Sequence, residues 1–136
     1  MGMKPIEEFE TEEQLQECLK WWKDKLFLTD WIIKAKLCAP EDFIEQGVCG
    51  ENEFDIVNKC CIIRIMKKKY YGERVMKYCA ERILVHELLH CKYNWLSCGS
   101  TYEGIYVDTM EHSLLEQIAK SLIMAKYDLP LDYFIS

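Results

Sequence analysis

The amino-acid sequence predicts an α+β domain with an N-terminal helix, a three-stranded and mainly antiparallel sheet, and two further helices. Two observations carry this prediction. Apolar residues recur at helical spacing in three separate segments, and β-branched and apolar runs bounded by turn residues fill the stretch after the first segment. The 136 residues, half of them hydrophobic, suit one domain covering residues 1–136.

The first helix is expected over residues 11–28. Thr11 and Gln14 have the spacing of a capping box, which marks a helix N-terminus. Apolar residues then follow three or four positions apart, as on the buried face of a helix. These residues are Leu15, Cys18, Leu19, Trp22 and Leu26.

Three strands are expected next. Residues 31–37 begin with apolar and β-branched residues and then alternate with Lys34 and Lys36. A shorter strand is expected over residues 47–54. Residues 60–66 form the clearest strand, because isoleucine and cysteine fill most of it.

Two helices complete the predicted order. Residues 73–93 contain neither glycine nor proline, and their apolar residues recur at helical spacing. Residues 94–107 are expected to form a loop that contains two glycines. Asp108 is a candidate N-cap for the last helix, which should end before Pro130.

Charge and cysteine usage exclude several classes of protein. A net charge of -6 disfavours nucleic-acid binding, and the run of Lys67, Lys68 and Lys69 is interpreted as a solvated loop. No apolar signal segment or membrane-spanning stretch is visible, so we expect a cytoplasmic protein without a membrane partner. The eight cysteines are then reduced, and no CxxC pair indicates a four-cysteine zinc site.

The motif that carries chemistry is His86-Glu87-Leu88-Leu89-His90. Residues four apart stand one turn above each other on a helix, so both imidazoles can reach one metal ion from the same side. Buried imidazoles need partners, and a metal supplies one for both. Glu87 lies beside the ion without ligating it. Its apolar neighbours should raise its proton affinity, as suits a general base.

The third metal ligand is expected from the last helix. His112 is the only other histidine and lies in the predicted first turns of that helix. Glu111 and Glu116 are alternatives, because carboxylates also bind zinc. Glu111 could instead complete a capping box with Asp108. Glu116 could instead lie outside the ligand shell and accept a hydrogen bond from a ligating imidazole, or be a solvated charge.

Three tyrosines border the predicted site in the sequence. Tyr102 and Tyr106 are candidate hydrogen-bond donors to a developing oxyanion, and Tyr93 lies nearby. Because the chain contains eight tyrosines, packing is the competing interpretation for each of them.

His86, Glu87 and His90, followed one loop later by Glu111, His112 and Glu116, resemble the zincin metallopeptidases. The compact size is similar to that of small phage- or prophage-encoded metallopeptidases and minimal gluzincins. The resemblance implies that the two motif histidines bind one zinc ion and that Glu87 activates water. It further implies that the strand over residues 60–66 holds an extended peptide. The glycine and third histidine that follow the motif in metzincins are absent, since Cys91-Lys92-Tyr93 follows here.

The sequence therefore favours a zinc-dependent hydrolase, a metallopeptidase acting on a peptide or protein substrate. The alternative is a non-catalytic, metal-stabilised protein-interaction module. A third hypothesis is a metal-free interaction domain in which His86 and His90 are core residues. No pattern in the sequence specifies an oligomeric state or a cleavage preference.

Overall fold

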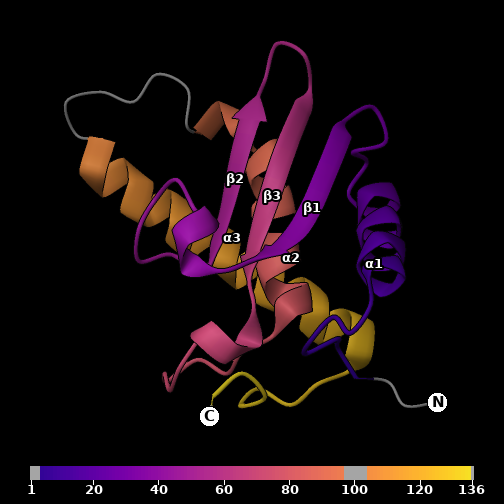
Figure 1. Cartoon of the computed structure of the whole chain (residues 1–136), viewed down its shortest axis with the longest axis vertical. Helices are drawn as coiled ribbons and strands as arrows, with labels where there is room; N and C mark the ends of the chain where they lie inside the picture. The colour runs from indigo at the N-terminus through magenta and orange to yellow at the C-terminus, as the bar shows by residue number, and fades with distance from the viewer. Residues whose placement is uncertain (1–3, 97–103, 136) are drawn as a thin grey trace.

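The protein is a two-layer α+β structure, seen in a computed structural model that describes residues 4–96 and 104–135. Its main elements are the helices α1 (Glu12–Lys25), α2 (Ala80–Lys92) and α3 (Gly104–Tyr127) and the strands β1 (Ile32–Cys38), β2 (Gly50–Asp55) and β3 (Cys60–Met66). Figure 1 shows α2 and α3 behind the sheet and α1 beside β1, and α3 packs on α2. The predicted class and element order are confirmed. No helix in the described ranges has the length and apolar character needed to cross a bilayer.

The sheet is mixed, so the prediction of a mainly antiparallel sheet is wrong. Its strand order is β1-β3-β2: β3 pairs in parallel with β1 and antiparallel with β2. A tight turn over residues 56–59, with Lys59 at a φ of 50°, returns the chain from β2 into β3. A longer connection joins Cys38 to Gly50, and β2 does not pair with β1. Strand β3 pairs with β1 instead, and the two strands run parallel.

The central position of β3 contradicts the expectation that residues 60–66 hold a peptide. Ladder hydrogen bonds to β1 and β2 occupy both edges of this strand along its length. In the described part of the chain, β2 is instead an edge strand, with one side paired to β3. An extended ligand could therefore pair with β2 but not with β3.

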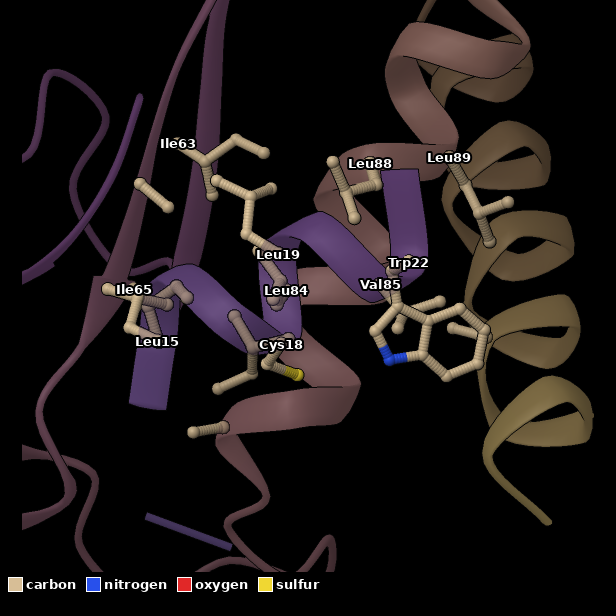
Figure 2. Close-up of a cluster of buried hydrophobic side chains, with 14 of the residues drawn as sticks. Leu15, Cys18, Leu19, Trp22, Ile63, Ile65, Leu84, Val85, Leu88 and Leu89 are labelled. Carbon is tan, nitrogen blue, oxygen red and sulfur yellow. The ribbon is translucent and has the colours of Figure 1, made fainter. Parts of the chain in front are cut away.

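The core lies between α1, α2 and the covered face of the sheet. Alternate residues of β3 point into it, and Ile63 and Ile65 are fully buried. Figure 2 shows α1 side chains meeting those of α2 over this face. The labelled residues there are Leu15, Cys18, Leu19, Trp22, Ile63, Ile65, Leu84, Val85, Leu88 and Leu89. The predicted apolar stripe of the first helix is thus buried.

The two later helices begin at other residues than the sequence predicted. Helix α2 starts at Ala80 and not at residue 73, because both ends of the chain bind the backbone before it. The N–H of Lys77 donates to the carbonyl of Phe134, and the N–H of Ala80 donates to that of Glu7. Helix α3 starts at Gly104, so Asp108 lies inside it and is not its N-cap. Its end at Tyr127, before Pro130, is as predicted.

A buried carboxylate on α2 ties the helices together. Glu81 is fully buried and accepts hydrogen bonds from four groups of distant segments. They are the backbone N–H of Ile6 (2.9 Å), the indole of Trp22 (2.8 Å), the ammonium of Lys126 (2.9 Å) and the hydroxyl of Tyr127 (2.8 Å). Because these groups lie on the N-terminal segment, α1 and α3, Glu81 fixes the positions of all three against α2.

Glu81→Ala should lower the free energy of unfolding by about 3–5 kcal/mol, because it leaves a partly buried ammonium and three other donors unpaired. Urea unfolding followed by tryptophan fluorescence measures this change. Glu17→Ala, an exposed position on α1, is the matched control and should stay within about 0.5 kcal/mol of the parent. Equal stability of the two variants would contradict the role given to Glu81.

Candidate metal centre

The candidate site forms where α2 and α3 face each other. Going up α2, Arg82, His86 and His90 follow at intervals of one helical turn. Arg82 contacts Glu116 of α3, and His90 contacts Glu111, so the partners occur in the opposite order along α3. The helices are therefore antiparallel here, and regular i to i+4 spacing brings their polar side chains together.

Three imidazoles meet between the two helices. Candidate ligand atoms of His86, His90 and His112 all lie within 4.8 Å of one another. His86 Nε2 and His112 Nδ1 are 3.4 Å apart. Two nitrogens bound at about 2.0–2.1 Å to one tetrahedral zinc ion would be separated by roughly 3.4 Å. The three histidines could hold one metal ion.

Two carboxylates contact the opposite ring nitrogens. Glu116 Oε2 lies 3.4 Å from His86 Nδ1, and Glu111 Oε1 lies 3.2 Å from His90 Nδ1. A proton on each Nδ1 would be donated to the carboxylate and would leave Nε2 free to accept a metal. His112 is thus one of the three histidines that could bind a metal ion. Glu111 and Glu116 contact the Nδ1 atoms of His90 and His86 instead.

Arg82 holds Glu116 in place. Its Nη1 donates to both carboxylate oxygens of Glu116, at 2.8 and 2.9 Å. Burial alone would raise the pKa of Glu116, but the hydrogen bond with His86 and the charge of Arg82 lower it to about 2. Glu116 is therefore an anion across the ordinary pH range and can orient His86.

Glu87 lies under β2 at the point where this strand crosses α2. Its side chain is buried, and among the described residues its carboxylate has no hydrogen-bond partner. Burial raises the pKa of Glu87 to about 7, an effect that the charge of His86 opposes. The raised proton affinity expected from its apolar neighbours is confirmed.

Two residues of β2 fix the strand against Glu87. A Cβ on Gly50 would lie 2.6 Å from Ile83 Cγ2 and 2.9 Å from Glu87 Oε2, so only glycine allows this approach. Two positions on, the Nδ2 of Asn52 donates to the backbone carbonyl of Glu87 at 2.8 Å. The edge strand and the motif helix are thereby held in contact.

Two cavities open on this arrangement. The arginine cavity, about 230 Å³, is lined by Gly47, Val48, Cys49, Gly50, Arg74, Arg82, Ile83, His86, Glu87, His112 and Glu116. The glutamate cavity, about 440 Å³, is lined by Glu45, Val48, Gly50, Glu51, Asn52, Phe54, Glu87, His90, Glu111 and His112. Glu87 and His112 belong to both linings, so a ligand in either cavity reaches the same polar centre.

The state of His90 suits a metal ligand. Burial and the neighbouring charges of His86 and His112 lower the pKa of His90 to about 3. The pKa of His86 is raised, because Glu116 and Glu87 outweigh the opposing effect of burial. His90 is therefore a neutral imidazole with a lone pair available for a cation.

The tyrosine predictions stay untested. Tyr102 lies outside the described residues. Tyr106 belongs to α3, but its side chain also falls outside the described part. Tyr93 packs edge-on to Trp95 with ring centroids 6.3 Å apart, and it lines neither cavity.

Sequence reasoning missed Arg82, Gly50 and Asn52. Arg82 lies one turn before His86, so the helical spacing contained a signal for it. Gly50 and Asn52 reach α2 only through the strand register, for which the local sequence has no signal. No protein-family model, curated protein or solved structure matches this chain.

His86→Ala, His90→Ala and His112→Ala should each weaken zinc binding by at least about 100-fold, because each removes one of three imidazole donors. Competition with a chromophoric chelator measures the affinity, and elemental analysis should give one zinc ion per parent chain. If His112→Ala binds zinc as tightly as the parent, the third metal ligand is Glu111 or Glu116 and not His112.

Gly50→Ala should destabilise the fold by about 1–3 kcal/mol, because the added methyl group meets Ile83 and Glu87 in a packed contact. Thermal unfolding of the metal-free chain measures the loss. Glu17→Ala, the exposed position on α1, is again the control and should change stability little. An unchanged unfolding temperature in Gly50→Ala would contradict a close packing contact between β2 and α2 at this position.

Proposed function

We propose that the chain is a zinc-dependent hydrolase that cleaves peptide bonds. The observation that carries the proposal is the convergence of His86, His90 and His112 beside a buried carboxylate, Glu87, which lines both adjoining cavities. Three imidazoles are a ligand set of catalytic zinc sites, which keep a fourth position for water or substrate.

The donor set supports zinc over harder cations. Imidazole nitrogens suit zinc, whereas magnesium and calcium prefer oxygen ligands. A zinc ion held there would polarise a carbonyl group and lower the pKa of a water molecule toward neutrality. The contacts of Glu111 and Glu116 with the outer ring nitrogens would orient two of the three ligands.

Glu87 is assigned the proton transfers. Its carboxylate is free of hydrogen-bond partners among the described residues, and it faces the cavities where a water and a carbonyl carbon would meet. In the proposed reaction Glu87 takes a proton from the attacking water and then gives it to the leaving amine. The close passage of Gly50 and the bond from Asn52 would keep the carboxylate in position.

The edge position of β2 supports a peptide substrate. An extended peptide can add to an edge strand through backbone hydrogen bonds, and β2 borders the glutamate cavity with Gly50, Asn52 and Phe54. Such a peptide would pass directly over Glu87. This assigns to β2 the substrate-holding role that the resemblance had assigned to residues 60–66.

Glu87→Gln should lower the cleavage rate at least about 100-fold while leaving zinc affinity unchanged, because the amide cannot accept the proton but does not alter the imidazoles. Zinc-loaded protein is incubated with randomised peptide pools, and products are identified by mass spectrometry. Glu17→Ala is the control and should cleave at the parent rate.

Full activity of Glu87→Gln would rule out the assigned role of this residue. A parent chain that binds zinc and gains thermal stability from it, yet cleaves no pool, would support the alternative of a metal-stabilised interaction module.

A further inference from the structure

Arg82 is a buried cation with an unused hydrogen-bonding group. Only 3% of the residue is exposed, and its Nη1 serves Glu116. Its Nε has no hydrogen-bond partner within the described residues. A buried N–H without a partner is unfavourable, and Arg82 forms part of the wall of the arginine cavity. This N–H is covered in the present arrangement, so a ligand with acceptor oxygens would satisfy it after a small movement of the guanidinium toward the cavity.

Arg74 supplies a second guanidinium at the same cavity. It is exposed, and its guanidinium stacks over the ring of Tyr71 at 4.4 Å while Nε donates to the Tyr71 carbonyl. Arg74 also lines a neighbouring cavity of about 510 Å³ that contains Lys68. Positive charge therefore continues outward from the arginine cavity.

The other side of the candidate metal centre has the opposite charge. The lining of the glutamate cavity includes Glu45, Glu51 and Glu111 but no lysine or arginine among the described residues. The arginine cavity also contains Glu87 and Glu116, but its two arginines make it the less repulsive side of Glu87 for an anionic group.

We propose that the arginine cavity is a carboxylate subsite, in which Arg74 and Arg82 bind an acidic group of the substrate next to the cleaved bond. This inference rests on the proposed hydrolase function. Guanidinium groups match the planar geometry of a carboxylate. At about 230 Å³ the cavity is small for a ligand pocket, so it takes a single residue. The carboxylate belongs either to the peptide C-terminus or to an Asp or Glu side chain.

Direct binding decides the proposal independently of turnover. Hippurate, an acylated amino acid with a free carboxylate, is titrated into the metal-free chain and into zinc-loaded Glu87→Gln while the arginine Nε–H NMR signals are followed. Hippuramide, which lacks the charge, is the matched ligand. We expect hippurate to shift the signals of Arg74 and Arg82 in both proteins and to bind at least about tenfold more tightly than hippuramide.

Variants test the assignment without disturbing the buried residue. Arg74→Gln should weaken hippurate binding at least about tenfold, and Lys36→Gln, an exposed lysine of β1 outside the cavities, should leave it unchanged. Equal binding of hippurate and hippuramide, or unchanged affinity in Arg74→Gln, would overturn the proposal.

Three peptide pools identify the source of the carboxylate. The first has free C-termini and lacks Asp and Glu, the second is amidated and contains both, and the third is amidated and lacks both. Cleavage near the C-termini of the first pool, or beside acidic residues of the second, should exceed cleavage of the third. Equal rates in all three would overturn the subsite and leave the hydrolase intact. No cleavage would contradict the proposed function, and hippurate binding would still decide the subsite.

Discussion

Burial of α2 on nearly all its sides requires hydrogen-bond partners for most of the polar groups that this helix contains. Glu81 receives four donors from the N-terminal segment, α1 and α3, and Arg82 pairs with Glu116. The carboxylate of Glu87 is different, because the described residues supply it with no hydrogen bond. Two buried groups of α2 that form no hydrogen bond with the described residues, the Glu87 carboxylate and the Arg82 Nε, thus belong to residues that both line the arginine cavity. A carboxylate in a buried site without hydrogen-bond donors is suited to proton transfer.

The position of this site depends on close contacts among three elements, α2, α3 and β2. Helix α3 crosses α2 so that His112 and Glu116 meet His86, while β2 crosses α2 so that Gly50 touches Glu87. The sheet order β1-β3-β2 makes β2 the edge strand over the site. Within the described residues, this order leaves β2, the strand that contacts Glu87, with one side unpaired.

The arginine cavity and the glutamate cavity, which adjoin at Glu87, differ in the charge of their linings. Arg74 and Arg82 lie on one side of Glu87, and Glu45 and Glu111 lie on the other. Both arginines come from the stretch between β3 and the middle of α2, whereas the carboxylates come from segments far apart in the chain. Electrostatic orientation of a bound peptide would follow from this division, independently of any side-chain pocket.

The sequence by itself determined the helix and strand content, the strand over residues 60–66 and the pairing of His86 with His90, because these depend on local periodicity. It also indicated His112, because this is the only other histidine and it lies early in the next predicted helix. Only the tertiary structure decided the start of α2, the parallel pairing of β1 with β3, and the contacts of Gly50, Asn52 and Arg82. These depend on which distant segments meet: chain ends that bind residues 77–80, a strand register, and the antiparallel approach of α3. Local sequence patterns do not predict these contacts between distant segments, because the free energy that favours them arises only when separate elements pack together.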